Sequence, residues 1–379
     1  MPIIRRLAAL SQLTTLATLA LCLFLCAPAL AGAQNAAKAK PTRVAFVLLD
    51  TIDDQGWTTA HYDGIEHLKR TLGDNVQVSY AEKVKDPAHA EQVFRDYARQ
   101  GYDLIFGTTF EHMEPLYAVA AEFPKTAFMH CAGFKTRPNL GTYMVRIEQG
   151  EYLAGYLAGL MGFRNVGTVA TVAIPEVIRG INAFTLGLAR GLAESGTAHD
   201  PAKINTVVWL NSWRDAEHET SMAEALAAAG HDLIREMADT SESSRAACAK
   251  GVPAIGYGTD STRFGAGCVL TSTTFEWGPV YVETVKRLRA GVWNSEPVFT
   301  GFESGSVGLS ALGKAVPADV ARKVLALKAR MTHGRDRSFQ GPIVDQTGQE
   351  RIGPGRKATD AELLSMDWLV RGVSGTLPR

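Results

Sequence analysis

From residue 42 onward, the hydrophobic positions form short runs that alternate with longer stretches of helical spacing. The helical stretches lie near residues 58–72, 87–100 and 112–122. The apolar runs read RVAFVLL, NVQVSYAE, YDLIFGT, TAFMHCA and GTYMV. Short apolar runs that are each followed by a helix are typical of buried parallel strands in βαβ units. This part of the chain therefore predicts one doubly wound α/β sheet with helices on both faces.

The same alternation then begins again. A helical stretch, EQGEYLAGYLAGLMGF, leads into four more strand candidates: NVGTVATV, INTVVWL, HDLIREM and PAIGYG. An amphipathic helix follows near 277–290, the run VFTGFESGSVGLSAL reads as strands, and a last helix is expected near 359–371. No Gly/Ser linker separates the two series. We therefore predict two α/β lobes with a cleft between them, and ligands of such sheets bind beyond the carboxyl ends of the strands.

Length and charge fit this picture and exclude one class of partner. The chain has 379 residues, 46% of them hydrophobic, which suggests about two domains. It carries 39 basic and 39 acidic residues, and like charges do not form long runs. A nucleic-acid or anionic-membrane surface is therefore not expected.

The first 31 residues have the pattern of a secretory signal peptide. Arg5 and Arg6 precede an almost wholly apolar stretch, residues 7–26, and APALAGA offers a cleavage site after Ala31. An uncleaved membrane anchor is the alternative, because the stretch is long enough to span a bilayer. A lipid anchor is disfavoured, since Cys22 and Cys26 each follow a leucine where processing requires a small residue. We expect an exported, periplasmic protein.

Three cysteines remain after this segment: Cys131, Cys248 and Cys268. Their spacing matches no zinc or redox motif, and an odd number leaves at least one thiol without a partner in the same chain. A Cys248–Cys268 bridge is one alternative in an oxidising compartment. We expect buried, inert thiols instead.

The familiar enzyme motifs fail. In GLSALGKA, Ala315 stands where a nucleotide-binding loop needs a magnesium-binding hydroxyl. The glycines around Ser304 and Ser306 do not form a nucleophile elbow. The histidines show no metal-binding pair, so neither a metal nor a cofactor is expected. The sequence therefore predicts a binding protein rather than an enzyme.

The strand-end loops instead combine aromatic and acidic side chains. Trp57 follows the first strand of the first series in DDQGW, beside Asp53 and Asp54. Trp213 has the equivalent place in the second series in NSWRDAEHE, beside Asp215. A flat ligand between the two indoles would be stacked on both faces, at about 1–3 kcal/mol per stack. The carboxylates would accept hydrogen bonds from its N–H groups.

A purely structural interpretation competes with this one. Asp53 or Asp54 could cap the helix that begins near Thr58, and Asp215 could cap the helix that follows it. A loop tryptophan can also cover the edge of a local core. The matching positions of the two tryptophans make ligand binding and structural packing about equally good explanations.

Several longer runs resemble one known family. IPEVIRGINAFTLG (174–187), VVWLNSWRDAEHE (207–219), WGPVYVETVKRLRAGVW (277–293) and the tail from GPIVDQTGQERI to LLSMDWLVRGV (341–373) are similar to the basic membrane protein (BMP) family of ABC-importer solute receptors. The resemblance covers nearly all of the chain after the signal segment. It implies the type I periplasmic-binding fold, two doubly wound parallel-sheet lobes joined by a hinge. We expect lobe 1 at 42–147 plus 275–297, lobe 2 at 148–274 plus 298–345, and a tail with a terminal helix at 346–379.

The resemblance also implies a set of ligand contacts. Trp57 and Trp213 match the two stacking aromatic positions of nucleoside-binding members. The other expected contacts are Asp53, Asp54, Phe110, Asp215, Asp239, Asp260 and Glu276.

Two departures from the family pattern bear on the ligand. The loop TSTTFEWGP lacks the lysine that nucleoside binders carry, which favours a free purine base or similar flat heterocycle. Arg214 replaces a phenylalanine and is expected to point outward.

The function that this resemblance implies is a periplasmic receptor that closes its lobes on a purine-like base. It would act as a monomer and dock on an ABC permease in the inner membrane. Four alternatives stay open: a purine nucleoside receptor, a ligand sensor for a membrane signalling protein, a type I sugar receptor and a nucleoside hydrolase-like enzyme.

Overall fold

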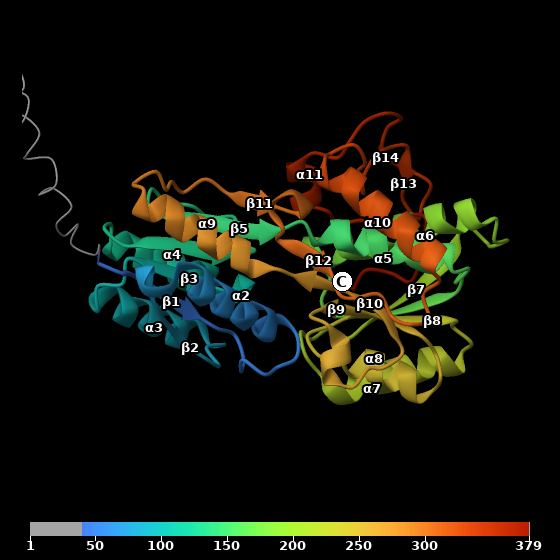
Figure 1. Cartoon of the computed structure of the whole chain (residues 1–379), viewed down its shortest axis with the longest axis horizontal. Helices are drawn as coiled ribbons and strands as arrows, with labels where there is room; N and C mark the ends of the chain where they lie inside the picture. The colour runs from blue at the N-terminus through green and yellow to red at the C-terminus, as the bar shows by residue number, and fades with distance from the viewer. Residues whose placement is uncertain (1–39, 379) are drawn as a thin grey trace, which may run out of the picture. The chain divides into compact units, whose positions relative to one another are not determined.

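Two mainly parallel β-sheets form the frame of the protein (Figure 1). The computed structural model describes residues 40–378, so the predicted signal peptide lies outside the described residues. The first sheet has the strand order β11-β5-β4-β3-β1-β2. Its strands are β1 (Thr42–Val47), β2 (Val76–Ala81), β3 (Leu104–Gly107), β4 (Ala127–Cys131), β5 (Leu140–Val145) and β11 (Val298–Thr300).

The second sheet has the order β12-β10-β9-β8-β6-β7-β15. Its strands are β6 (Val166–Ala170), β7 (Lys203–Trp209), β8 (Leu233–Met237), β9 (Ala254–Gly258), β10 (Val269–Phe275), β12 (Val307–Leu309) and β15 (Gly372–Ser374). Only β12 runs antiparallel to its neighbour in this sheet. A small hairpin, β13 (Ile343–Val344) and β14 (Glu350–Ile352), stands apart from both sheets.

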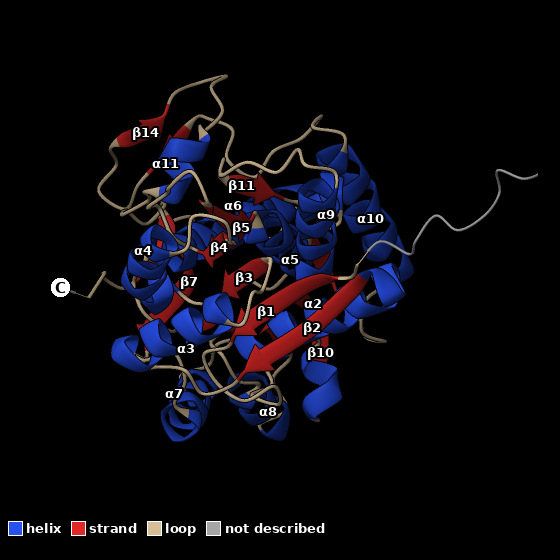
Figure 2. Ribbon diagram, turned by 90° about the vertical axis from the view of Figure 1, so that its left-hand side faces the viewer, coloured by secondary structure: helices blue, strands red, loops and turns tan. Residues whose placement is uncertain are grey.

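Helices cover both faces of each sheet, as the alternation of the sequence predicts (Figure 2). The helices are α2 (Trp57–Leu72), α3 (Pro87–Arg99), α4 (Met113–Glu122), α5 (Ile147–Leu160), α6 (Pro175–Ser195), α7 (Ala216–Ala228), α8 (Glu242–Ala249), α9 (Trp277–Arg289), α10 (Ala318–Thr332) and α11 (Asp360–Leu364). We call the first sheet with α2, α3, α4 and α9 lobe 1, and the second sheet with α5–α8 and α10 lobe 2.

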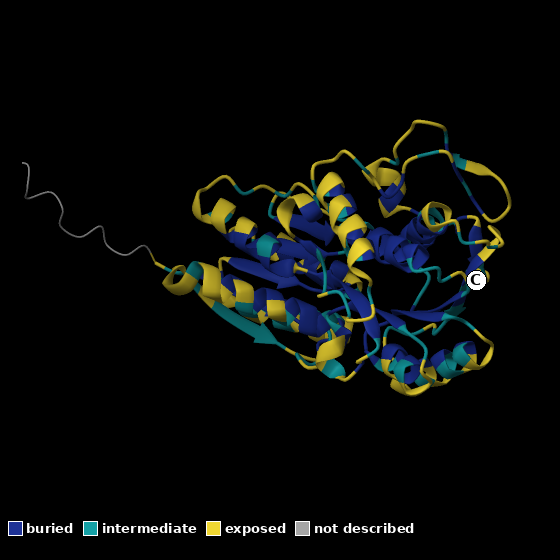
Figure 3. Cartoon of the chain, turned by 45° about the vertical axis from the view of Figure 1, so that its right-hand side comes forward, coloured by how far each residue is buried: buried dark blue, intermediate teal, exposed yellow. Residues whose placement is uncertain are grey.

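Strand β1, which lies between β3 and β2 in the first sheet, shows why both faces are covered. Val44, Phe46 and Leu48 belong to one hydrophobic cluster, whereas Ala45 and Val47 belong to another. Because successive side chains of a strand point to opposite faces, an uninterrupted apolar run needs packing partners on both sides. Figure 3 shows the consequence, with buried strands inside and helices exposed only on their outer faces.

Helices α5 and α6 form the tightest packing in lobe 2. A Cβ at Gly155 would lie 2.9 Å from the backbone nitrogen of Leu188, and one at Gly191 would lie 2.7 Å from that of Leu160. Glycine at these points lets the two helix backbones approach more closely than side chains would permit. Helix α5 is buried along its whole length as a result.

The chain passes between the sheets three times: from β5 to α5, from β10 to α9, and from β11 to β12. The sheets differ from the predicted lobe ranges at two places. Residues 298–300 pair with β5 in the first sheet rather than joining lobe 2. Residues 372–374 of the expected tail pair with β7 in the second sheet, and the terminal helix is only Asp360–Leu364.

The preference for free thiols was wrong for two of the three cysteines. Cys248 and Cys268 form a disulfide, with their Cα atoms 5.3 Å apart. Cys131 is buried and free, and burial raises the pKa of its thiol well above the ordinary value. In the described part of the chain, no helix combines the length and hydrophobicity needed to cross a membrane.

Reduction of this disulfide should destabilise lobe 2. The bridge joins residues 20 positions apart, and closing a loop of that length stabilises a fold by about 2–4 kcal/mol. Dithiothreitol should therefore lower the melting temperature of the wild-type protein in a calorimetric scan. A Cys248→Ser/Cys268→Ser variant should melt at that lower temperature with or without reductant. Equal melting temperatures of oxidised and reduced wild-type protein would contradict the expectation.

Candidate functional site

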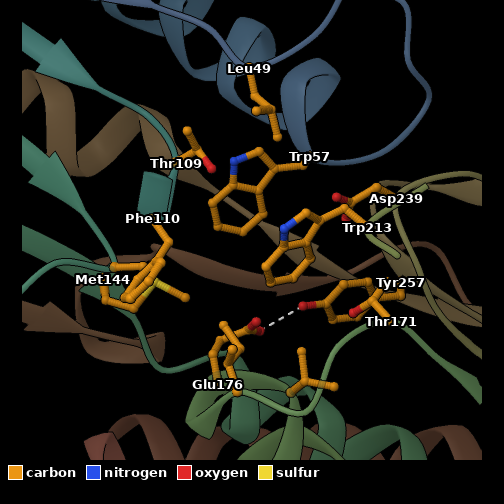
Figure 4. Close-up of a pocket in the computed structure, with 13 residues that line it drawn as sticks. Leu49, Trp57, Thr109, Phe110, Met144, Thr171, Glu176, Trp213, Asp239 and Tyr257 are labelled. Carbon is orange, nitrogen blue, oxygen red and sulfur yellow. Dashed lines mark hydrogen bonds between the residues drawn. The ribbon is translucent and has the colours of Figure 1, made fainter. Parts of the chain in front are cut away.

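The candidate site is a cavity between the strand-end loops of the two lobes (Figure 4). It encloses about 460 Å³ free of protein atoms, part of it open to solvent. Four of the nine predicted site residues line it: Trp57, Phe110, Trp213 and Asp239. The other lining residues are Leu49, Thr109, Ala132, Met144, Thr171, Ile174, Glu176, Val177 and Tyr257.

Trp57 is the first residue of α2, directly after the loop that leaves β1. Its indole Nε1 donates a hydrogen bond to the carbonyl oxygen of Thr108, at 2.7 Å. The ring makes edge contacts with Phe275 and Trp277, at centroid distances of 5.1 and 5.5 Å. An aromatic cluster therefore holds the indole in one orientation, directed into the cavity (Figure 4).

Trp213 comes from lobe 2, in the loop between β7 and α7. Its Nε1 donates a hydrogen bond to Oε1 of Glu111, at 2.9 Å. Glu111 lies in the loop after β3 in lobe 1, so this bond crosses the cleft. The orientation of the second indole therefore depends on the closed arrangement of the lobes.

Two buried acids complete the cavity. Glu176, at the start of α6, accepts a hydrogen bond of 2.6 Å from the hydroxyl of Tyr257. Asp239 follows β8, and among the described residues no donor contacts its carboxylate within hydrogen-bond distance. Burial raises the pKa of both carboxyl groups, and for Asp239 nearby acids add to the effect. No lysine or arginine lines the cavity, so its polar character is that of an acceptor.

The other five predicted contacts lie outside the cavity. Asp54 is buried, and its carboxylate accepts hydrogen bonds from the backbone N–H groups of Thr58 and Thr59, at 2.9 and 2.8 Å. It therefore serves the start of α2, as the structural interpretation anticipated. Asp53 is exposed to solvent.

The remaining three acids also accept hydrogen bonds from nearby groups of the protein. Asp215 caps α7 through the N–H of His218, and Asp260 caps a short 3₁₀ turn through the N–H of Thr262. Glu276 is exposed and accepts a hydrogen bond of 2.8 Å from the Thr274 hydroxyl.

Sequence reasoning missed Glu176, Tyr257 and Glu111. Glu176 lies in IPEVIRG, directly beyond strand β6, so the search of strand-end loops could have found it. Glu111 lies in GTTFEHM, directly after Phe110, which is itself an expected ligand contact. Tyr257 lies inside β9, where the sequence offers no sign that its hydroxyl meets a carboxylate.

The lobes also touch around the rim of the cavity. The Thr259 hydroxyl donates to the carbonyl of Gln55 at 2.6 Å, and Arg263 forms an ion pair with Asp63 at 2.6 Å. Arg214 lies 3.5 Å from Asp50 of lobe 1 and does not line the cavity.

Backbone packing makes this contact closer still. A Cβ at Gly56 in lobe 1 would lie 2.7 Å from the Cα of Asp239 in lobe 2. Only a glycine allows the two loops to approach so closely.

A family model agrees with this architecture. The model for ABC transporter substrate-binding proteins of the PnrA-like type matches residues 41–332. The chain belongs to the Bmp family. This Bmp protein is 34% identical to a purine-binding protein of Brucella abortus, over 92% of this chain and 97% of that protein. It is 33% identical to a putative ABC transporter glucose-binding protein of Haloferax volcanii, over 88% of this chain and 81% of the relative.

A solved structure supports the fold. The solute-binding protein of an ABC transporter system from Conexibacter woesei superimposes with a TM-score of 0.63 at 24% identity, over 78% of this chain and 98% of that chain. The predicted periplasmic-binding fold is therefore confirmed. As a Bmp-family member, the protein is a substrate-binding component of an ABC system, which implies a small-molecule ligand and a permease partner. Proteins of this family bind substrates rather than convert them, and they typically act outside the cytoplasm.

The buried acids beside the cavity predict a pH effect on stability. Burial raises the pKa of Glu219 from 4.5 to about 7. Between these values the folded protein holds a proton that the unfolded chain has released, so stability should fall as pH rises. At about 1.4 kcal/mol per pKa unit, the fall should be about 3 kcal/mol.

Urea denaturation at pH 4.5, 6 and 8 tests this expectation. Glu219→Gln should make the fall smaller by the contribution of Glu219, since the amide does not titrate, while the other buried acids still contribute. The comparison uses the slope against pH, because the amide also loses one acceptor for the N–H of Asp215. Parallel pH profiles of wild type and variant would refute the assignment.

Proposed function

We propose that the protein binds a purine nucleobase, or a similar flat heterocycle, between Trp57 and Trp213. The observation that carries this proposal is the presence of two indoles, one from each lobe, in the lining of a single cavity. Each indole Nε1 already has a protein acceptor, so the aromatic surface is what remains for a ligand. Stacking on aromatic faces suits a planar ring and contributes about 1–3 kcal/mol for each face.

The acceptors of the cavity support a ligand that is rich in N–H donors. Asp239 has an unpartnered carboxylate, and Glu176 has an oxygen beyond the one that accepts from Tyr257. Purine bases carry ring N–H and exocyclic amino groups that such oxygens can accept from. An anionic ligand would meet these acids without a compensating cation in the lining. The purine-binding relative from Brucella abortus, similar over nearly its whole length, supports the same class.

A free base fits better than a nucleoside. The segment TSTTFEWGP, which spans the end of β10 and the start of α9, offers no lysine for a ribose. Micromolar affinity needs about −8 kcal/mol. Two stacks and two or three hydrogen bonds to carboxylates can supply this after the cost of association.

The transport cycle follows from these parts. The exported receptor, with residues 1–31 removed, would act as a monomer, close on its ligand by movement at the three crossovers, and deliver it to the inner-membrane permease. A sugar receptor is the second candidate, which the glucose-binding relative from Haloferax volcanii favours. Carboxylates also accept from hydroxyl groups, and aromatic rings can stack on pyranoses.

Mass spectrometry of small molecules released by denaturing the purified protein tests the ligand class. A purine-like heterocycle is expected in the released fraction or, for an empty receptor, as the best binder in calorimetric titrations with adenine, hypoxanthine, adenosine and glucose. Binding of glucose with no binding of any purine would replace the proposal with the sugar receptor.

Truncation of either indole should weaken binding. Trp57→Ala and Trp213→Ala should each raise the dissociation constant for adenine roughly 10–100-fold, because each removes one stack of about 1–3 kcal/mol. Trp293→Ala removes a half-buried tryptophan outside the cavity and serves as the matched control. Losses below about threefold for both cavity variants would exclude the sandwich.

Lobe closure should depend on Gly56. A methyl group there would overlap the backbone of Asp239, and relief of that overlap requires the lobes to separate. Overpacking of about 1–3 kcal/mol corresponds to a loss of adenine affinity of about 5- to 150-fold. Gly267→Ala is the control, since a Cβ at Gly267 meets nothing within 4 Å. X-ray scattering at saturating adenine should give Gly56→Ala the larger radius of gyration; equal affinities for both variants would show that closure tolerates the methyl group.

A further inference from the structure

A second, outer chamber adjoins the cavity on the side of Phe110 and Met144. It shares five lining residues with the cavity: Phe110, Ala132, Met144, Ile174 and Glu176. It contains about 1140 Å³ free of protein atoms, part of it open to solvent. Figure 4 labels Phe110 and Met144, two of the shared residues, in the lining of the inner cavity. A ring held between the tryptophans would therefore lie beside this chamber, with the shared side chains between the two spaces.

The walls of the outer chamber are apolar and come from both lobes. Phe134, in the loop after β4 of lobe 1, is 71% exposed, and Leu364, at the end of α11, is 44% exposed. Together with Phe110, they are three of the five large hydrophobic residues that the described chain exposes. Exposed apolar side chains that gather in one place commonly mark a binding site. The walls also include Pro297 and Phe299.

Two of the polar groups of the chamber, those of Arg179 and Ser365, are already engaged or out of reach. The Arg179 guanidinium donates to Glu148 through Nε at 3.0 Å and to the carbonyl of Leu363 through Nη1 at 3.0 Å, and its Nη2 is buried. The Ser365 hydroxyl donates to the carbonyl of Ala361. A phosphate would find no accessible cation among these lining residues. An apolar group needs no hydrogen-bond partner and can be buried against these walls.

We propose that the outer chamber is a second subsite, which receives an apolar substituent carried by the ring. The ligand class would then be a heterocycle with an alkyl or aryl group, rather than an unsubstituted base. This inference rests on the proposed function, because it assumes a flat ring in the inner cavity. Phe134 and Leu364 would favour a ring with an apolar substituent over an unsubstituted ring, since the substituent would cover their exposed apolar surface.

Isothermal titration calorimetry with three probes tests the proposal: adenine, 6-benzylaminopurine and 9-benzyladenine. The benzyl groups of the two compounds extend from opposite sides of the purine ring. One of them can therefore reach the chamber whichever edge of the ring faces the chamber. At least one should bind the wild-type protein about 10-fold more tightly than adenine. Phe134→Ser and Leu364→Ser should each reduce that preference to about threefold or less while leaving adenine affinity unchanged. Both side chains are exposed, and circular dichroism should confirm that the variants fold.

Leu325→Ser provides the matched control, because Leu325 is 56% exposed on α10 and lines neither space. It should retain the full preference. If adenine binds but neither benzyl compound binds more tightly, the subsite is refuted and the proposed function stands. A preference that survives both serine substitutions also refutes it. If no purine binds at all, the proposed function fails first, and the subsite fails with it.

Discussion

The opposition of two strand-end edges is the constraint on which the site depends. In a parallel sheet the carboxyl ends of the strands meet at one edge, so the loops that leave β1 and β3 gather in lobe 1 and those that leave β6, β7 and β8 gather in lobe 2. Three crossovers hold these edges face to face. A cavity lined by residues far apart in sequence, such as Trp57 and Asp239, follows from this topology.

The same opposition brings like charges together. Asp239 of lobe 2 lies near four other acids: Asp54 and Glu111 of lobe 1, and Glu176 and Glu219 of lobe 2. Their negative charges raise the pKa of the Asp239 carboxyl beyond the effect of burial. Hydrogen-bond donors on a ligand would offset part of this repulsion, because a carboxylate with a bound N–H is more stable in its charged form. An empty closed form lacks that compensation at Asp239. Ligand binding and the approach of the two lobes would therefore both depend on the charge of Asp239.

Local sequence patterns predicted the fold well because they depend on neighbouring residues. The alternation of apolar runs and helical stretches corresponds to β1 through α9. Trp57 and Trp213 both lie beyond the carboxyl ends of strands, but their places are not equivalent: Trp57 follows β1, whose counterpart in the second sheet is β6, whereas Trp213 follows β7. Pairings between residues far apart in the sequence were not predicted. The attachment of β11 to β5 and the Cys248–Cys268 bridge depend on tertiary contacts that no local pattern encodes.

The acids show a different limit of sequence reasoning. An aspartate at the start of a helix can cap that helix or contact a ligand, and the sequence alone does not distinguish the two roles. Asp54, Asp215 and Asp260 bond to helix-terminal N–H groups, whereas Asp239 precedes α8 without capping it and lines the cavity. The distinction lies in whether backbone donors reach the carboxylate, which is a property of the folded loop.

In the proposed mode of binding, the two indoles and the acids would have different roles. Both Nε1 groups are already bonded, Trp57 to Thr108 in its own lobe and Trp213 to Glu111 across the cleft. Neither ring can then read the hydrogen-bonding edge of a heterocycle, and stacking accepts many planar rings. In the proposed mode of binding, discrimination between rings would fall to Asp239 and Glu176, because their acceptor oxygens favour rings with correctly placed N–H groups. The Trp213–Glu111 bond exists only while the lobes are together, so closure itself orients the second stacking surface.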